Sequence, residues 1–571
     1  MIKQIKDGPE PSRPGAAQHF EAVRLEVAQR DGPQPAVSGF TRSIPNRIHG
    51  VANFLGRSRH NRPITVDYWK PMTDSSAAAD KPADDKATKT QRDAVERALA
   101  APPRRSTGSI KLGGRKLEYK VEGAFVPVVN LGQGEKRGEL EAAVFTTAYQ
   151  LERKSGDTRP RPICFAFNGG PGSASIWLQL GALGPKRLRI ASDGGMLPPP
   201  YEVEDNPLSW FEHFDLVFVD PPHTGYSITA SDDARKKLLA VDGDVACLTD
   251  VIRQWLSRHQ RWTSPIYLAG ESYGTTRGAA MADKLAEQGV SLAGLILISC
   301  AMDLQSIVFE PRNDLPYALY LPAYAGVAQY HGCLKGPQSK SAAAARALAT
   351  EFVESDYLRV LHRGASASHD ERSKAAKRIA ELTGLSASLV EHRNLRIADN
   401  TFFTELLRDR GQIVGRLEAR VAGPMGLART HEWDFDPGME SLVGPYTMAG
   451  MGYFIGTLGF DPAWHYEVLS METNKHWNWN RGDNQGNSYC CTSPDLSRAL
   501  RRNPHLRVLV ASGHFDLGTP STASDWSLAQ LDITPDVRQR VTHKYYDAGH
   551  MMYTRDEDLV KLKKDLAAWL P

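Results

Sequence analysis

The sequence contains few cysteines and no long hydrophobic run. Six cysteines are spread over 571 residues, far below the density of a small disulfide scaffold. The longest apolar stretch, around Leu292 to Met302, is much shorter than the roughly 20 residues that a helix needs to cross a bilayer. The first residues, MIKQIKDGPEPSRPGAAQHF, carry charge but lack the apolar part of a secretory signal. We therefore expect a soluble, cytoplasmic protein; export is the alternative if a misassigned start hides a leader.

A large excess of one charge is also lacking. Lys and Arg number 69 against 66 Asp and Glu, which gives a formal net charge of +3. So balanced a chain has no overall attraction for nucleic acid or for an anionic membrane. Hydrophobic residues make up 41%, enough for a sizeable core, and this excludes a wholly disordered chain. The length favours more than one folding unit, with a single enlarged unit carrying insertions as the alternative.

Residues 1–105 differ in composition from the rest of the chain. Pro, Gly, Ser, Ala and charged residues dominate, and SSAAADKPADDKATKT (75–90) predicts a flexible linker. Two segments, 40–55 and 62–69, contain enough apolar residues for short ordered pieces. We therefore expect an N-terminal extension that is partly disordered or docked on the remainder.

Short apolar runs separated by helical segments follow this extension. They lie at 161–167, 214–220, 265–270 and 292–300, and the pattern resumes at 506–513 and 541–549. Gly113-Gly114 between alternating apolar residues predicts a hairpin before them. This alternation is typical of an α/β fold with a mostly parallel sheet flanked by helices. We predict its two parts at 106–304 and 436–571, with a helical cap inserted at 305–435.

One pentapeptide, Gly270-Glu271-Ser272-Tyr273-Gly274, matches G-x-S-x-G. An apolar strand runs into Gly270 and a helical segment leaves Gly274, which is the strand–turn–helix context of a nucleophile elbow in an α/β-hydrolase. The alternative is an ordinary turn between strand and helix with a serine cap. The context favours Ser272 as a nucleophile.

A nucleophilic serine needs a base and an acid that orients the base. In α/β-hydrolases the three follow in the order Ser, Asp or Glu, His. Asp516 follows the apolar run at 506–513, and His550 follows the run at 541–549. Both thus lie at the carboxyl edge of the predicted sheet, where such folds build their sites. We predict that Asp516 orients His550 and that His550 takes the proton of Ser272.

The glycine-rich loop at 168–172, Asn-Gly-Gly-Pro-Gly, follows the first of these runs. A loop of this kind supplies one backbone N–H for an oxyanion, and Tyr273, the residue after the nucleophile, supplies the other. A phosphate-binding loop is the rival interpretation, but no Lys-Ser or Lys-Thr follows at the required spacing. The chain contains no HExxH and no paired CxxC, so we predict no metal and no cofactor.

Together these motifs resemble those of the serine carboxypeptidase family. The resemblance runs from about residue 106 to the end of the sequence and is carried by several short motifs in order. They are Asn168-Gly169-Gly170-Pro171-Gly172, Gly184-Pro185, Asn206-Pro207 with Ser209-Trp210, Gly270-Glu271-Ser272-Tyr273 and Gly549-His550-Met551. The chain departs from the family at Ser173, where many relatives have a cysteine that forms a disulfide.

The resemblance implies a role for each matching residue. Ser272, Asp516 and His550 correspond to the catalytic triad, and Gly170 and Tyr273 to the oxyanion hole. The family binds the free C-terminal carboxylate of a peptide through an Asn-Gly pair and two glutamates, one of them protonated. The matching residues here are Asn168, Gly169 and Glu271.

The second glutamate of that site is missing, because the family's Glu-x-Gly-Pro is Ala182-Leu183-Gly184-Pro185 in this chain. Without a second carboxyl beside it, Glu271 is expected to have a lower pKa than in the paired arrangement. An ionised Glu271 would repel a substrate carboxylate. Either a cation compensates, for which the candidates are Lys186, Arg187 and Arg277, or the substrate has no free C-terminus.

The function predicted from the sequence is that of a serine-type carboxypeptidase acting through an acyl-enzyme on a peptide or a small acyl substrate. An esterase or acyltransferase with the same triad is the alternative, and the loss of the carboxyl at Ala182 favours it. A catalytically silent binding scaffold is a third possibility, against which the intact triad weighs. Adjacent Cys490 and Cys491 are predicted to be free thiols, with a strained disulfide between them as the alternative. The sequence does not indicate the oligomeric state.

Overall fold

The computed structural model describes residues 81–571, with gaps at 153–159, 429–430 and 483–487. The two segments predicted to be ordered at 40–55 and 62–69 lie outside the described residues. Residues 81–100 form helix α1 (Lys81–Ala100), so the linker prediction was wrong for residues 81–90. Ala, Lys, Gln and Arg favour helix, and Val95 and Ala98 of α1 are buried against Ala143 and Ala230.

The central sheet has ten strands among the described residues, in the order β1-β2-β3-β7-β4-β9-β10-β13-β14, with β8 beside β3. Their bounds are β1 Arg104–Leu112, β2 Arg115–Val129, β3 Leu140–Leu151, β4 Ile163–Phe167, β7 Asp215–Val219, β8 Ile228–Thr229, β9 Ile266–Glu271, β10 Leu292–Ile298, β13 Arg507–Gly513 and β14 Val541–Tyr546. From β7 to β14, each strand pairs in parallel with its neighbour in the sheet. The antiparallel pairs are β1 with β2, β2 with β3, β3 with β7 and β3 with β8. The predicted α/β-hydrolase sheet is thus confirmed.

The turn between β1 and β2 is the hairpin predicted at Gly113-Gly114. The two glycines have φ values of 53° and 76°. A two-residue hairpin turn with both central residues at positive φ matches the twist of the flanking strands, and glycine takes this conformation without steric cost.

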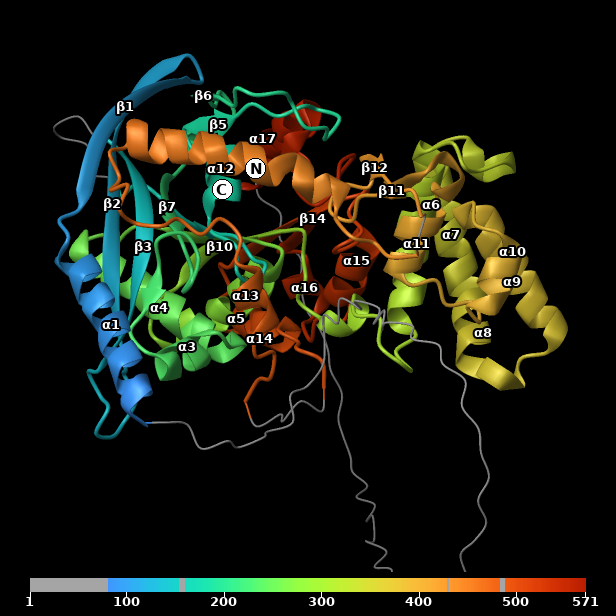
Figure 1. Cartoon of the computed structure of the whole chain (residues 1–571), viewed down its shortest axis with the longest axis horizontal. Helices are drawn as coiled ribbons and strands as arrows, with labels where there is room; N and C mark the ends of the chain where they lie inside the picture. The colour runs from blue at the N-terminus through green and yellow to red at the C-terminus, as the bar shows by residue number, and fades with distance from the viewer. Residues whose placement is uncertain (1–80, 153–159, 429–430, 483–487) are drawn as a thin grey trace, which may run out of the picture. The chain divides into compact units, whose positions relative to one another are not determined.

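Both faces of the sheet are buried, as expected for parallel strands. In β4, Cys164 and Ala166 belong to one hydrophobic cluster, while Phe165 and Phe167 belong to the other. One face is covered by α4 (Val241–Arg258), α5 (Tyr273–Glu287) and α14 (Ser493–Arg502), and the other by α12 (Pro437–Gly456) and α17 (Asp556–Trp569). Figure 1 shows α12 along one side of the sheet and α4 and α5 along the opposite side.

Six helices between β10 and β13 form the helical cap expected in the fold. They are α6 Leu315–Tyr330, α7 Ala342–Phe352, α8 Leu358–Arg363, α9 His369–Thr383, α10 Ala387–His392 and α11 Asp399–Glu405. The cap has a hydrophobic cluster of its own, which extends to Phe515 and Leu517 after β13. In Figure 1 the cap helices gather beside the β14 end of the sheet.

Short elements complete the described fold. The remaining α-helices are α2 Ile176–Leu178, α3 Asp232–Leu238, α13 Met471–Lys475, α15 Ser521–Ala529 and α16 Pro535–Arg538. Two small antiparallel pairs are β5 (Lys186–Leu188) with β6 (Val203–Asp205), and β11 (Gln412–Val414) with β12 (Ala422–Pro424).

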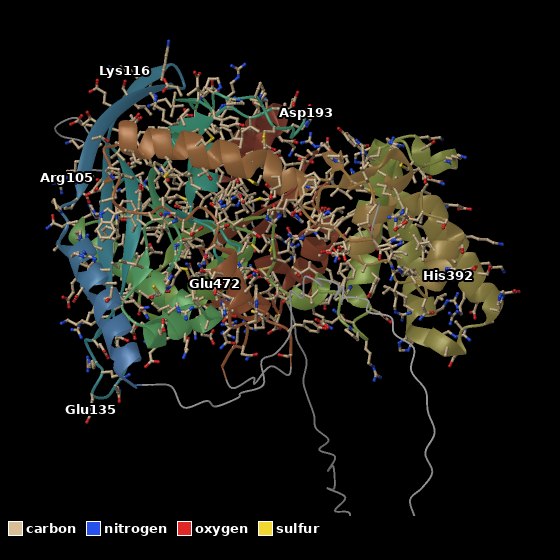
Figure 2. All side chains as sticks on the ribbon, viewed as in Figure 1. Arg105, Lys116, Glu135, Asp193, His392 and Glu472 are labelled. Atoms are coloured by element: carbon tan, nitrogen blue, oxygen red, sulfur yellow. The ribbon has the colours of Figure 1, made fainter. Side chains whose placement is uncertain are left out.

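Charged side chains are exposed and the cysteines form no disulfide in the described residues, as the composition predicts. Charged side chains such as Lys116, Glu135 and Glu472 lie on the outside of the ribbon (Figure 2). None of the helices in the described part of the chain is both long and apolar enough to span a bilayer. All six cysteines are free, which confirms the prediction for Cys490 and Cys491.

Candidate active site

Ser272 lies at the turn between the central strand β9 and helix α5. Its φ of 59° is unusual for a residue other than glycine, and its backbone N–H donates to the carbonyl of Ile298 at the end of β10 (2.9 Å). Gly270 and Gly274 make the sharp turn possible, because a Cβ on Gly270 would lie 2.1 Å from the carbonyl oxygen of Gly274. The spacing of G-x-S-x-G therefore reflects close backbone packing around a partly exposed serine.

Asp516 and His550 form a buried hydrogen-bonded pair beyond the ends of β13 and β14. Asp516 Oδ2 lies 2.8 Å from His550 Nδ1 and accepts the hydroxyl of Thr519 at 2.7 Å. Its other oxygen accepts the backbone N–H groups of Gly518 and Thr519. Burial opposes ionisation, but the charge of His550 and these hydrogen bonds outweigh it and lower the pKa of Asp516. Asp516 is therefore a preorganised carboxylate.

Burial alone would lower the pKa of His550. The carboxylate of Asp516 and, to a smaller extent, Glu271 outweigh this effect and raise the pKa above its ordinary value. The backbone of His550 is fixed at both ends, because its N–H donates to the carbonyl of Leu417 (2.6 Å) and its own carbonyl accepts the hydroxyl of Ser299 (2.6 Å). The imidazole is thus held in a state that takes up a proton readily.

Two of the three predicted triad residues, Ser272 and His550, are hydrogen-bonded to the carboxyl end of β10. Ser272 is bonded to Ile298, and His550 is bonded to the next residue, Ser299. In the described structure the hydroxyl of Ser272 and Nε2 of His550 are not hydrogen-bonded to each other. The structure therefore brings Asp516 and His550 into contact, whereas Ser272 follows β9, which β10 separates from β13 and β14. Hydrogen bonds to a nucleophile are often long without a substrate.

The glycine-rich loop lies directly on the nucleophile turn. A Cβ on Gly169 would come within 2.4 Å of the backbone nitrogen of Tyr273 and 2.6 Å of the carbonyl of Glu271. Gly170 has a φ of 98°, a conformation that favours glycine. The two predicted oxyanion donors, Gly170 and Tyr273, therefore belong to segments in direct backbone contact.

The side chain of Tyr273 is anchored by residues that the sequence did not single out. Its hydroxyl donates to buried Asp244 (3.1 Å), which also accepts Nε of Arg277 (2.6 Å). The rings of Trp477 and Trp479 pack edge-on against the tyrosine ring at centroid distances of 5.0 and 5.5 Å. These contacts fix the start of α5, and with it the backbone N–H of Tyr273.

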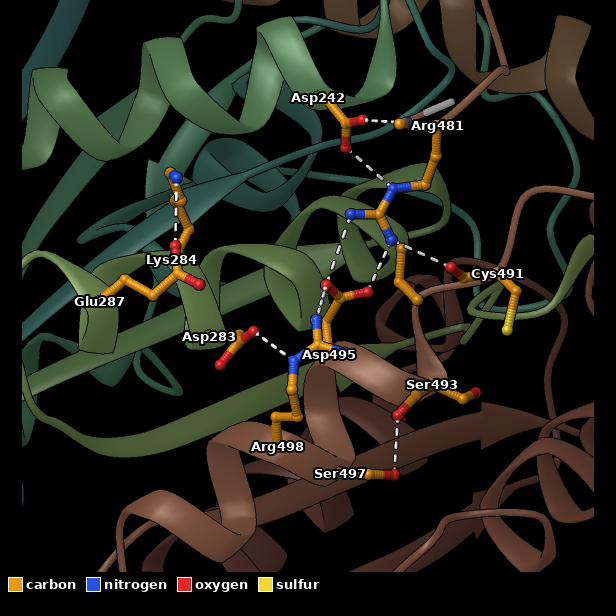
Figure 3. Close-up of polar contacts among 12 residues, drawn as sticks. Asp242, Asp283, Lys284, Glu287, Arg481, Cys491, Ser493, Asp495, Ser497 and Arg498 are labelled. Carbon is orange, nitrogen blue, oxygen red and sulfur yellow. Dashed lines mark hydrogen bonds and ion pairs between the residues drawn. The ribbon is translucent and has the colours of Figure 1, made fainter. Parts of the chain in front are cut away.

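A polar network holds the segment that carries these two tryptophans (Figure 3). Arg481 donates to Asp242 at the start of α4 (2.9 Å) and to Asp495 in α14 (2.6 Å). Asp495 also accepts Arg498, which in turn donates to Asp283 of α5 (2.8 Å each). The network therefore ties the tryptophan segment to three helices on one face of the sheet.

Glu271, the residue before the nucleophile, is only 4% exposed. Asn168 Nδ2 donates to its Oε1 (3.0 Å), and the hydroxyl of Tyr553 donates to its Oε2 (2.7 Å). The amide of Asn168 is itself oriented by the backbone N–H of Leu178. Burial raises the pKa of Glu271 to about 7, although His550 and the two hydrogen bonds act in the opposite direction. No motif in the sequence pointed to Tyr553.

A second Ser, His and Asp arrangement lies elsewhere in the molecule. His543 of β14 lies 2.9 Å from Ser512 Oγ through Nε2 and 2.9 Å from Asp525 Oδ1 through Nδ1. The hydroxyl of Tyr545 also donates to Asp525 (2.6 Å). Ser512 is a fully buried residue of strand β13.

Comparison with known proteins finds similarity in the central part of this chain. The profile described as "Serine carboxypeptidase" matches residues 146–308, a range that holds Asn168, Glu271 and Ser272 but ends before Asp516 and His550. Serine carboxypeptidase-like 13 of Arabidopsis thaliana is 26% identical over 192 residues. A pheromone-processing carboxypeptidase of Ogataea parapolymorpha is 29% identical over 199 residues. The central part of this chain is thus similar to the serine carboxypeptidase family.

The similarity to these serine carboxypeptidases is partial. The alignments cover 33% and 32% of this chain, and 41% and 30% of the respective relatives. Among solved structures, the prohormone-processing carboxypeptidase of Saccharomyces cerevisiae aligns with a TM-score of 0.47 at 15% identity, over 79% of this chain and 91% of that one. The aligned part thus spans less than half the length of either curated relative.

The serine carboxypeptidase motif around Asn206 holds the segment that contains Ala182. Asn206 Nδ2 donates to the carbonyls of Ala182 (2.8 Å) and Gly184 (2.9 Å), and the hydroxyl of Ser209 donates to the carbonyl of Leu183 (2.7 Å). The backbone from Ala182 to Gly184 is thus firmly held.

The three cations considered as compensation for Glu271 are paired elsewhere. Lys186 bonds Asp205 and Arg187 bonds Glu204, while Arg277 bonds Asp244 and the carbonyl of Asn168. Burial, rather than a neighbouring cation, is the largest effect on the pKa of Glu271.

Proposed function

We propose that this protein is a serine-type carboxypeptidase that removes C-terminal residues from peptides through an acyl-enzyme. The observation that carries the proposal is the 2.8 Å Asp516–His550 pair at the end of the sheet beside the Ser272 elbow. The match of residues 146–308 to the serine carboxypeptidase family supports it independently.

In the first half-reaction, Ser272 Oγ attacks the carbon of the scissile carbonyl while His550 takes the hydroxyl proton. The Asp516 carboxylate stabilises the resulting imidazolium, which its charge and hydrogen bond already favour. As the tetrahedral intermediate collapses, the carbon–nitrogen bond breaks and His550 returns the proton to the leaving amine. The acyl group remains as an ester on Ser272.

The backbone N–H groups of Gly170 and Tyr273 act on the oxyanion of each tetrahedral intermediate. Such donors stabilise the transition state most when they are fixed in advance, and the packing of the loop against the turn fixes these. In the second half-reaction His550 activates a water molecule, which attacks the ester and releases the shortened peptide.

Asn168, Gly169 and Glu271 are proposed to recognise the terminal carboxylate of the substrate. A protonated Glu271 donates a hydrogen bond to that carboxylate, whereas an ionised Glu271 repels it. With a pKa of about 7, the protonated form is present in comparable amount at neutral pH. The acyl-enzyme also allows an esterase or acyltransferase function, and the missing carboxyl at Ala182 is the observation that favours this second candidate.

A fluorophosphonate probe tests whether the protein is a serine hydrolase. We expect it to label the wild-type protein and not Ser272→Ala, as seen by mass spectrometry of the labelled peptide. Equal labelling of both proteins would assign the reactive serine elsewhere.

A set of matched substrates then separates carboxypeptidase from esterase. Rates are compared for a blocked dipeptide with a free C-terminus, for its amide and for its methyl ester. Preference for the free carboxylate supports the carboxypeptidase; hydrolysis of the ester alone would favour the esterase.

A further inference from the structure

Glu271 shares its buried position with the side chains of two tyrosines. The hydroxyl of Tyr553 donates to Glu271 Oε2 at 2.7 Å. The hydroxyl of Tyr446 is buried close by but has no hydrogen bond partner among the described residues. Both side chains lie over Gly181, because a Cβ there would lie 2.4 Å from the ring of Tyr553 and 2.5 Å from the oxygen of Tyr446. The residue next to Gly181 is Ala182.

A phenol and a carboxyl differ as neighbours of a buried carboxyl group. Two adjacent carboxyls cannot both ionise without strong repulsion, so they titrate as a coupled pair. A phenol stays neutral through the physiological range, and burial raises the pKa of Tyr553 still further. It donates a hydrogen bond to an ionised carboxyl and accepts one from a protonated carboxyl.

We propose that Tyr553 is a positioning residue for substrate recognition: its hydroxyl takes the place beside Glu271 that a second carboxyl would occupy, and leaves Glu271 as the single acidic group facing the terminal carboxylate of the peptide. This inference rests on the proposed carboxypeptidase function and deepens it. Recognition of a free C-terminus then depends on the protonation of a single group, the Glu271 carboxyl. At neutral pH a part of the molecules still has this carboxyl protonated.

The other charged and titratable groups around Glu271 act on it through space. His550, beyond β14, lowers its pKa, and Asp516, beyond β13, raises it. Tyr446 of α12 faces the same cluster and has a raised pKa, to which burial and the charge of Glu271 contribute. Asn168 and Tyr553 donate hydrogen bonds that favour the ionised form. Removal of the Tyr553 hydroxyl therefore raises the pKa of Glu271 and extends carboxylate binding to higher pH.

The experiment measures kcat/KM for the blocked dipeptide and for its amide between about pH 5.5 and about pH 9. Hydrolysis of both substrates requires His550. The ratio of the two kcat/KM values therefore does not depend on the protonation of His550. In the wild-type protein we expect the preference for the free carboxylate to fall tenfold per pH unit above a midpoint near 7. In Tyr553→Phe the midpoint moves up by about one unit, because one hydrogen bond to the ionised form is lost.

Tyr446→Phe is the matched control, since it removes a buried hydroxyl from the same cluster that bonds to nothing described there. We expect its midpoint to equal that of the wild type. Glu271→Gln cannot ionise, so its substrate preference should not change with pH. A Tyr553→Phe profile that coincides with the wild type, or an equal shift in Tyr446→Phe, would overturn the proposal.

Failure of this inference can be told apart from failure of the proposed function. If Ser272 is labelled by the fluorophosphonate and the amide or ester is hydrolysed, but the substrate preference of the wild type does not vary with pH, the role of Tyr553 and Glu271 is refuted and the hydrolase stands. If Ser272 is not labelled and no substrate is cleaved, the carboxypeptidase itself is refuted.

Discussion

The molecule contains two arrangements of serine, histidine and aspartate, and only one has the surroundings of a nucleophile. Ser512, His543 and Asp525 form an unbroken chain of short contacts, with both histidine nitrogens engaged. Ser272, His550 and Asp516 have a direct contact only between the last two. Judged by hydrogen bonds alone, the first arrangement would be the better triad.

The difference between the two serines is the backbone around them. Ser512 is a fully buried residue within a regular strand. Ser272 is partly exposed at a strained turn, at the N-terminus of a helix and under a glycine loop. Reactivity needs access for a substrate and donors for an oxyanion in addition to a base. The comparison teaches that the strand-to-helix turn, rather than the residue types, distinguishes Ser272 from Ser512.

The largest expected contrast in kcat is between two variants that each lack one serine hydroxyl. Ser272→Ala should lower kcat by about 10⁵-fold or more, because no acyl-enzyme forms. Ser512→Ala should leave kcat within about threefold of the wild type, because Ser512 contacts no reacting atom. Both are measured with the blocked dipeptide under saturating conditions. Comparable losses of kcat in the two variants would contradict the choice of Ser272 over Ser512 as the nucleophile.

The two aspartates give the next largest contrast. Asp516→Asn should lower kcat by about 10³- to 10⁴-fold, because the imidazolium of His550 loses its carboxylate and the required tautomer is no longer favoured. Asp525 is half exposed beside His543, so Asp525→Asn should change kcat less than about threefold. Steady-state rates at pH 8 compare the two, and a strong effect of Asp525→Asn would contradict the assignment.

A substitution in the glycine-rich loop should affect the arrangement that contains Ser272 and leave the one that contains Ser512 unchanged. In Gly169→Ala the new methyl group would press on the backbone nitrogen of Tyr273 and displace an oxyanion donor, so kcat should fall by about 10²-fold. Because Gly169 is also proposed to recognise the terminal carboxylate, KM should rise as well. Gly444→Ala on α12, where an added Cβ meets nothing within 4 Å, is the control. A rise in KM with unchanged kcat would mean that the methyl group disturbs carboxylate recognition alone and leaves the oxyanion donor in place.

The smallest expected effect concerns stability. Ser512→Ala removes the partner of His543 Nε2 inside the sheet, so the free energy of unfolding should fall by about 1–2 kcal/mol. The measurement is urea denaturation followed by tryptophan fluorescence. An unchanged midpoint would mean that the buried arrangement does not stabilise the fold either.

Much of the fold and of the candidate site was predictable because it depends on local patterns. Apolar runs marked the parallel strands, and Ser272, Asp516 and His550 each follow such a run directly. Parallel strands bring their carboxyl ends to one edge, so three distant residues could be assigned to one place. The G-x-S-x-G spacing similarly reflects a steric requirement within one turn.

The contacts that escaped prediction depend on packing between distant segments. Tyr553 reaches Glu271 across 282 positions of the chain, and Trp477 reaches Tyr273 from a segment without regular structure. Neither contact leaves a short motif. The helical state of residues 81–90 was missed because their charge and alanine content suit both a linker and a helix, and the burial of Val95 and Ala98 favours the helix.

The position of the nucleophile strand in the middle of the chain has a consequence for biosynthesis. β9 and the elbow are synthesised long before β13 and β14, which lead to Asp516 and His550. A ribosome adds about 5–20 residues per second, so the 282 positions between Glu271 and Tyr553 take on the order of tens of seconds. During that time the nascent chain carries its serine without a base. On the proposed mechanism, the site is therefore complete only when the late strands join the sheet.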